Sequence, residues 1–133
     1  MVSAEKTLTI LLRVSAILLL FALVPVFIPH AWMDKIHREL GLGTMPTGPL
    51  VEYLTRSISM LYAMHGTIVL YASLDVRRHR GLIRLLATVG LVFGVGMTVL
   101  DCTAGLPLHW IIGEGPMLLV FNSVLLWLTT RIA

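Results

Sequence analysis

Four ionisable residues lie near the ends of apolar stretches, and their spacing suggests shared chemistry. Glu52 and Arg56 are four residues apart, so they occupy one face of a helix. Asp101 ends the next apolar stretch and Glu114 begins the last one. An arginine guanidinium can hold one carboxylate through two hydrogen bonds. With three carboxylates for one arginine, at least one acid remains to be protonated, to contact water or to bind a cation.

Arg56 itself has two interpretations, which the sequence leaves equally open. It lies about 12 Å of helix rise beyond Gly48, at the depth of hydrocarbon, where ionisable groups usually face the protein interior and pair. In the structural interpretation it ties the second span to the third or fourth. In the functional interpretation it belongs to a ligand site, because a small and partly polar stripe continues its face. That stripe is Ser59, Ala63 and Gly66, all within about 80° of Arg56 around the helix, and it is typical of a cavity lining.

Glu114 stands in the sequence Gly113-Glu114-Gly115-Pro116. Glycine and proline both weaken a helix interior, so we expect a break or kink of the last span here. A helix start that faces a cavity would offer free amides to an anionic group, but we favour a plain first turn with proline near its first position. Trp110 is expected first as an interfacial anchor and second as a ligand contact. The candidate ligand-binding residues are therefore Glu52, Arg56, Ser59, Asp101, Trp110 and Glu114.

The middle of the second stretch holds a candidate proton relay, Tyr62 and His65, about one helical turn apart. The simpler interpretation is that His65 forms a hydrogen bond with a neighbouring helix. His65 lies well inside its span and His109 lies at the outer side, so the two cannot ligate one haem within a monomer. No recognised metal-ligand spacing is present, and we expect neither a metal site nor a cofactor.

Enzymatic chemistry has the weakest support among the function classes. It needs a nucleophile beside a base, and Cys102, the only cysteine, next to Asp101 is the nearest approach. A neighbouring carboxylate disfavours the thiolate, so Cys102 is a poor nucleophile. We rank a binding or accessory role first and a subunit of an oligomeric channel or transporter second, because the residues that follow Ser59 on its face are not polar. A membrane-embedded enzyme ranks third.

The elements that position these residues are four apolar stretches, expected as spans at about 8–28, 50–74, 82–101 and 110–131. Hydrophobic residues make up 57% of the chain and charged residues 13%, too few charges for the surface of a soluble domain. Each stretch approaches the ~20 residues that cross ~30 Å of hydrocarbon, where only a helix satisfies its own backbone. The sequence therefore predicts an all-α transmembrane four-helix bundle forming one domain over 1–133. The first stretch lacks a small-x-small cleavage pattern, which favours a retained helix over a signal peptide.

The long connector between the first two spans contains an expected surface helix at about 31–40. Apolar residues recur every four positions on one of its faces, and opposite charges at i,i+4 spacing occupy the other. The apolar residues are Trp32, Ile36 and Leu40, and the charged pairs are Asp34–Arg38 and Lys35–Glu39. Such an amphipathic helix is typical of the membrane interface.

Small residues mark one face of the third span, where Gly90, Gly94 and Thr98 are four apart. In lipid this spacing allows close approach of two helices. We favour packing within the bundle over contact with another subunit, and a homo-oligomer stays an open alternative.

Arginines in one connector predict the orientation. Arg77, Arg78, Arg80 and Arg84 fall between the second and third stretches, whereas loop 101–109 has no lysine or arginine. Cytoplasmic loops are the basic ones, so both termini are expected in the cytoplasm. No basic stripe with interleaved aromatic residues is present, which argues against nucleic acid as a partner. The lipid bilayer is the expected partner.

Several segments resemble those of uncharacterised small four-span bacterial membrane proteins. They are Glu52-Tyr53-Leu54-Thr55-Arg56-Ser57, Leu61-Tyr62-Ala63-Met64-His65-Gly66, Asp101-Cys102-Thr103-Ala104-Gly105-Leu106-Pro107, and Trp110 through Gly113-Glu114-Gly115-Pro116. The broad layout is also similar to that of the DoxX-like group over most of the chain. The resemblance implies a multi-pass protein of the bacterial inner membrane, and it carries no activity because no motif with an assigned role is shared.

The predicted orientation can be tested with single cysteines in a Cys102→Ser background. Thr44→Cys should react with an impermeant thiol reagent in intact cells, because residue 44 lies in the expected outer connector. His79→Cys should react only after lysis. The opposite labelling pattern would contradict the orientation.

Overall fold

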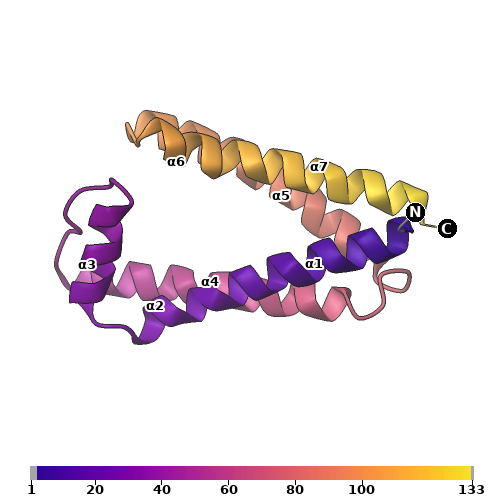
Figure 1. Ribbon diagram of the computed structural model, residues 1–133, viewed down its shortest axis with the longest axis horizontal. Helices are drawn as coiled ribbons and strands as arrows, with labels where there is room; N and C mark the ends of the chain where they lie inside the picture. The colour runs from indigo at the N-terminus through magenta and orange to yellow at the C-terminus, as the bar shows by residue number, and fades with distance from the viewer. Residues whose placement is uncertain (1–2, 133) are drawn as a thin grey trace. The chain divides into compact units, whose positions relative to one another are not determined.

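Helices make up most of the chain. In the computed structural model, which describes residues 3–132, every regular element is helical. The elements are α1 (Ala4–Leu20), the 3₁₀ turn η1 (Phe21–Leu23), α2 (Val24–Phe27), α3 (His30–Glu39), α4 (Pro49–Ala72), α5 (Arg80–Thr103), α6 (Leu108–Gly113) and α7 (Gly115–Arg131) (Figure 1). The predicted all-α fold class is confirmed.

Three of the helical stretches are long and apolar enough to cross a membrane. They are Ala4–Phe27, Arg80–Thr103 and Leu108–Arg131, each of 24 residues. At 1.5 Å per residue, a helix of this length spans roughly 36 Å, more than the hydrocarbon thickness. The chain therefore has the helices of a membrane protein. α4 is equally long, at 24 residues, but its hydroxyl groups, Glu52, Arg56 and His65 make it less apolar than the other three.

Helix ends extend beyond the apolar stretches that predicted them. α1 begins at Ala4, and the Ser3 hydroxyl oxygen accepts a hydrogen bond from the backbone N–H of Lys6 at 3.3 Å. A serine in this position satisfies one of the free amides at a helix start. α5 likewise begins at Arg80, two residues before its expected range. Hydrophobicity locates the lipid-facing part of a helix, whereas hydrogen bonding continues into polar flanking residues.

The fold divides into two compact units. One comprises Met1–Leu12 with Tyr71–Ala133, and the other comprises Arg13–Leu70. We refer to them as the α5–α7 unit and the α3–α4 unit, and each is described by itself.

In the α3–α4 unit, α4 packs closely against the C-terminal part of α1 at Gly66. A Cβ atom on Gly66 would lie 2.8 Å from the Leu19 Cβ and 3.1 Å from the Ala16 carbonyl oxygen. Ser59 and Ala63, on the same stripe of α4, are both buried. The prediction that this stripe lines a cavity is therefore wrong at Gly66, because small residues there serve close helix approach.

In the α5–α7 unit, the same small-residue packing joins α5 to α7. A Cβ on Gly94 would lie 3.1 Å from a Leu119 methyl carbon, and a Cβ on Gly115 would lie 2.7 Å from the backbone nitrogen of Thr98. Thr98 donates its hydroxyl to the Gly94 carbonyl at 2.8 Å, so its polar group is satisfied within α5. The glycine face of α5 therefore packs within the chain, as the sequence predicted.

Asn122 of α7 fills the space that Gly90 leaves. Its side chain is buried, and a Cβ on Gly90 would lie only 2.5 Å from its amide oxygen. Its amide nitrogen donates to the Leu118 carbonyl of α7 itself at 2.8 Å. Asn122 thus packs across the helix interface while its hydrogen bond stays within α7, rather than joining the two helices as one would expect of a buried asparagine in a span.

The connector between α4 and α5 is tied to the start of α1. Arg77 donates from Nε to a Glu5 carboxylate oxygen at 2.9 Å, and this hydrogen bond with the Glu5 charge raises the pKa of Arg77 above its usual value. The Asp75 carboxylate accepts the backbone N–H of Arg78 at 3.0 Å. At the other terminus, the Arg131 guanidinium lies over the Trp127 ring at 5.2 Å. These contacts order the basic end of the α5–α7 unit.

The glycine packing can be tested by adding one methyl group. Gly115→Ala should lower the free energy of unfolding by about 1–3 kcal/mol, because the new Cβ would meet the Thr98 backbone nitrogen and the Gly94 carbonyl oxygen, which cannot rotate away. Gly96→Ala is the matched control, since its Cβ would have no heavy atom within 4 Å. Thermal unfolding in detergent should separate the two variants. Equal melting temperatures for both would contradict the close packing.

Candidate functional site

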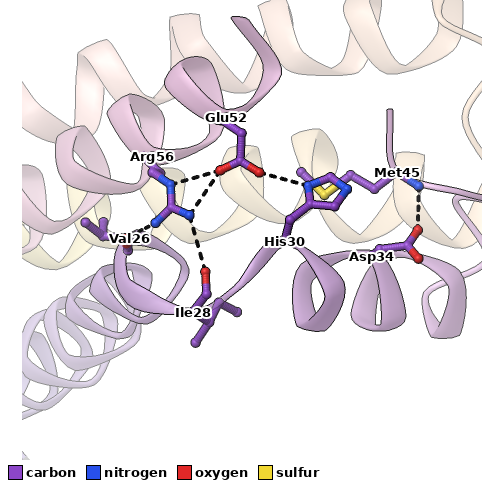
Figure 2. Close-up of polar contacts among 7 residues, drawn as sticks. All are labelled: Val26, Ile28, His30, Asp34, Met45, Glu52 and Arg56. Carbon is purple, nitrogen blue, oxygen red and sulfur yellow. Dashed lines mark hydrogen bonds and ion pairs between the residues drawn. The ribbon is translucent and has the colours of Figure 1, made fainter. Parts of the chain in front are cut away.

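Arg56 lies at the centre of the first polar cluster (Figure 2). Its Nε and Nη2 atoms both donate to one carboxylate oxygen of Glu52, at 3.1 and 3.0 Å. Its Nη1 atom donates to the Val26 carbonyl oxygen, and Nη2 also reaches the Ile28 carbonyl oxygen at 3.4 Å. The guanidinium therefore joins α4 to the end of α2.

Arg56 binds the carbonyl groups of Val26 and Ile28. Both lie at the end of α2, where backbone carbonyls have no donor within the helix. Ile28, at the C-terminus of α2, has an extended backbone with ψ of 149°, as expected for a residue before Pro29. The last carbonyl groups of a helix have no intrahelical partner, and a positive charge is favourable beside them. Arg56 thus caps the first long helix from a neighbouring one.

Glu52 extends this cluster to α3. Its second carboxylate oxygen lies 3.0 Å from His30 Nδ1, and His30 is the first residue of α3. Both side chains are about one-third exposed, at 33% and 28%. Glu52 therefore contacts Arg56 on its own helix and His30 across the turn at Pro29, and both of its oxygens have partners.

The connector after α3 folds back onto that helix through Asp34 (Figure 2). The backbone N–H of Met45 donates to one Asp34 carboxylate oxygen at 2.9 Å, and Arg38 binds the other. The Met45 hydrogen bond lowers the pKa of Asp34, the Arg38 charge acts in the same direction, and partial burial opposes both. The two predicted ion pairs on α3, Asp34–Arg38 and Lys35–Glu39, are both formed.

A second polar cluster lies in the α5–α7 unit and centres on Glu114. The indole Nε1 of Trp110 donates to a Glu114 carboxylate oxygen at 2.7 Å. Glu114 separates α6 from α7, and its backbone angles, φ −103° and ψ −83°, are not helical. The predicted break in this span is confirmed. α7 also begins directly after Glu114 with Pro116 in its first turn, as we favoured, and the short α6 precedes the break.

Asp101 completes this second cluster from the last turn of α5. Its side chain is 2% exposed, and within residues 3–132 its Oδ2 atom has no hydrogen-bond partner. The Asp101 and Glu114 carboxylates are close enough to interact electrostatically. We call Asp101, Trp110 and Glu114 the acid-pair cluster.

No lysine or arginine of its own unit can reach the acid-pair cluster. The sequence has none between Arg84 and Arg131. Arg84 precedes Asp101 by 17 residues and Arg131 follows Glu114 by 17 residues, which is roughly 25 Å of helix in each case. The helix between these arginines and the two carboxylates therefore places no lysine or arginine beside the acid-pair cluster.

The six predicted ligand-binding residues fall into two groups. Glu52 and Arg56 meet in the α3–α4 unit, and Ser59 is buried one turn further along α4. Trp110 and Glu114 are hydrogen-bonded in the α5–α7 unit, and Asp101 belongs to the same unit. The proposed relay residues, Tyr62 and His65, are both half-buried on α4, and their role stays a prediction.

Sequence reasoning missed His30 and the carbonyls of Val26 and Ile28 as partners of the Arg56 cluster. These residues precede Glu52 by more than 20 positions, and only the turn at Pro29 brings them together. The contact between Trp110 and Glu114, by contrast, has a local signal, because the two are four residues apart around a helical turn.

Two shallow hollows in the α3–α4 unit lie away from the predicted ligand residues. One is lined by Ile17, Leu20, Phe21 and Val24, and the other by Trp32, Lys35, Ile36 and Glu39. Within the part of the chain that the structure describes, no three His, Cys, Asp or Glu side chains are grouped so that they could hold a metal ion.

The capping role of Arg56 can be tested by a double-mutant cycle. Arg56→Leu should lower the free energy of unfolding by about 1–3 kcal/mol, because it leaves one Glu52 oxygen and two carbonyls without their donors. Arg56→Leu with Glu52→Gln should recover only part of the loss, since the carbonyls of Val26 and Ile28 stay unsatisfied. Thermal unfolding in detergent gives both values.

Arg13→Leu serves as the control for this cycle, because Arg13 is an exposed arginine of α1. If Arg56→Leu is no more destabilising than Arg13→Leu, Arg56 does not hold the end of α2.

Comparison with known proteins finds no matching family model, no similar curated protein and no similar solved structure. Function must therefore be argued from the two clusters themselves.

Proposed function

We propose that this protein is a four-span membrane protein that binds a small polar ligand or ion at the outer end of its third and fourth spans. The acid-pair cluster is the binding site in this proposal. The protein acts as a binding or accessory protein of a bacterial inner membrane, with both termini in the cytoplasm.

The second span in chain order is α4, which joins the three apolar stretches in this proposal. Its 24 residues are long enough to cross hydrocarbon, and its two charged residues partner each other, since Arg56 holds Glu52. Ionisable groups in a span are tolerated when they pair in the protein interior. The pairing of Glu52 with Arg56 therefore lowers the cost of placing α4 in hydrocarbon.

The basic connector supports the outer location of the site. Arg77, Arg78, Arg80 and Arg84 fall at the N-terminal end of α5, which the positive-inside rule assigns to the cytoplasm. Asp101 is at the opposite end of the same helix, and Glu114 follows the short α6. Both acids then belong to the outer side.

The observation that carries the proposal is the buried, unpartnered Oδ2 atom of Asp101. A carboxylate out of contact with water is costly unless a donor or a cation compensates it. The acid beside it, Glu114, adds a second negative charge rather than compensation. A positively charged or hydrogen-bond-donating ligand would satisfy both groups.

The packing of α5 on α7 favours binding over conduction through this unit. Directly inward of the acids, Gly115 lies so close to Thr98, and Gly94 so close to Leu119, that an added Cβ on either glycine would crowd its neighbour. A further turn inward, Asn122 fills the space beside Gly90. A channel needs a polar or hydrated path, and these contacts close the α5–α7 interface.

Ligand binding can be tested with the purified protein in detergent. A Trp32→Phe, Trp127→Phe variant leaves Trp110 as the only tryptophan, so its fluorescence reports on the hydrogen bond to Glu114. Titration with Na⁺, K⁺, Ca²⁺ and methylammonium should give a saturable change for at least one of them. Asp101→Asn or Glu114→Gln should weaken that binding at least about tenfold, because each removes one interacting charge.

Glu39→Gln is the matched control, because Glu39 is an exposed acid of α3 at 66% exposure. Its binding should equal that of the parent protein. The proposal fails if none of the four probes gives saturable binding, or if binding survives both Asp101→Asn and Glu114→Gln.

A further inference from the structure

We infer that α3 binds the headgroup of a zwitterionic phospholipid with a primary ammonium group, of the phosphatidylethanolamine class. The site is the shallow hollow on α3 that is lined by Trp32, Lys35, Ile36 and Glu39, which we call the α3 hollow. It shares no residue with the acid-pair cluster, so the inference does not depend on the proposed function.

The position of α3 in the chain places it at the edge of the bilayer. The first apolar stretch that is long enough to cross a membrane ends at Phe27, which is 80% exposed, and α3 begins at His30. The intervening residues, Ile28 and Pro29, have extended backbones. This connection covers at most about 10 Å, so α3 begins within reach of the headgroup layer.

The opposite face of α3 packs against the protein. Residues three and four apart share one face of a helix, and on this face Met33 is buried. His30 contacts Glu52, and Asp34 accepts the backbone N–H of Met45 (Figure 2). One turn further, His37 Nδ1 lies 3.0 Å from the Gly43 carbonyl oxygen. These contacts hold α3 in one orientation, with the α3 hollow directed away from them.

The α3 hollow combines an apolar pair with a charged pair. Trp32 and Ile36 are 65% and 48% exposed, and the Lys35 and Glu39 side chains are 77% and 66% exposed. The members of each pair are four residues apart, so the two pairs run side by side along the helix. At a membrane surface, the apolar pair suits the upper acyl chains and the charged pair suits the headgroup layer.

The charged pair complements both charges of an ethanolamine headgroup. Lys35 Nζ lies 4.0 Å from a Glu39 carboxylate oxygen, and an exposed ion pair of this kind contributes little stability, so a headgroup can replace it. The Lys35 ammonium would bind the lipid phosphate, and the Glu39 carboxylate would accept hydrogen bonds from the lipid ammonium. An ethylene bridge joins these two lipid groups, so one molecule supplies both.

The charge of the α3 hollow disfavours an anionic lipid. Helices that bind anionic membranes carry many lysines and arginines on their polar face, whereas here Glu39 balances Lys35. The other arginine of α3, Arg38, binds Asp34 and is not part of the lining. A choline headgroup has the same two charges but no N–H group to donate to Glu39, which favours the primary ammonium.

Quenching of Trp32 fluorescence by brominated lipids tests the inference. A Trp110→Phe, Trp127→Phe variant leaves Trp32 as the only tryptophan. It is reconstituted in phosphatidylcholine vesicles that contain a small fraction of phosphatidylethanolamine with brominated acyl chains. This lipid should quench about threefold more effectively than brominated phosphatidylglycerol or phosphatidylcholine at the same fraction, as expected of one exposed charge pair. In the otherwise unaltered protein, Trp32→Phe should abolish the same preference.

Lys35→Gln and Glu39→Gln should each remove the preference for phosphatidylethanolamine, because each removes one of the two matching charges. Lys6→Gln is the matched control, since Lys6 is an exposed lysine of α1, and it should keep the preference. A preference that survives both Lys35→Gln and Glu39→Gln overturns the site.

The remaining outcomes each overturn one part of the inference. Equal quenching by phosphatidylcholine and phosphatidylethanolamine overturns the primary ammonium, and stronger quenching by phosphatidylglycerol overturns the zwitterionic class. If Trp32 is not quenched when all of the lipid is brominated, α3 does not contact the bilayer and the whole inference fails.

Discussion

Polar groups in hydrocarbon must find partners within the protein, and this constraint organises the described structure. Arg56 meets it by directing its donors at Glu52 and at the carbonyls of Val26 and Ile28. The first long helix can end at Ile28, before Pro29, because another helix supplies donors for its last carbonyls. Glu52 then reaches His30, so one ion pair fixes the end of α2, the start of α3 and the start of α4. Without Arg56, three elements would lose their common contact.

The same constraint explains why close packing uses glycine. α5 and α7 have few polar groups with which to attract each other, so their contact depends on van der Waals approach. Gly94 and Gly115 remove the side chains that would hold the backbones apart, and Thr98 satisfies its hydroxyl within α5. Because Gly115 directly follows Glu114, the contact also fixes where Glu114 lies relative to the end of α5. The close contact at Gly115 therefore also helps to position Glu114.

The sequence predicts the local features of this fold better than its long-range contacts. Helix positions, the ion pairs of α3, the break at Glu114 and the glycine face of α5 all depend on residues within a few turns of each other. Glu52 with Arg56 is predictable for the same reason. His30 and the carbonyl partners of Arg56 depend on the path of the chain at Pro29, which periodicity does not encode. The prediction of a cavity lining failed at Gly66 because small residues suit both a cavity wall and a close helix contact. Only the positions of Ala16 and Leu19 show that Gly66 makes a close helix contact.

The two polar clusters differ in how their buried charges are compensated, and this difference suggests a structural role for one and a binding role for the other. In the Arg56 cluster the compensating charge is a side chain, which is covalently fixed and can only be removed by mutation or unfolding. In the acid-pair cluster, Glu114 accepts a hydrogen bond from a neutral indole N–H, and no lysine or arginine stands between Arg84 and Arg131. The proposed ligand would supply the compensating charge from outside the chain. A site of that kind can change its occupancy while the fold stays the same, and for this reason we place the proposed function at Asp101 and Glu114 rather than at Arg56.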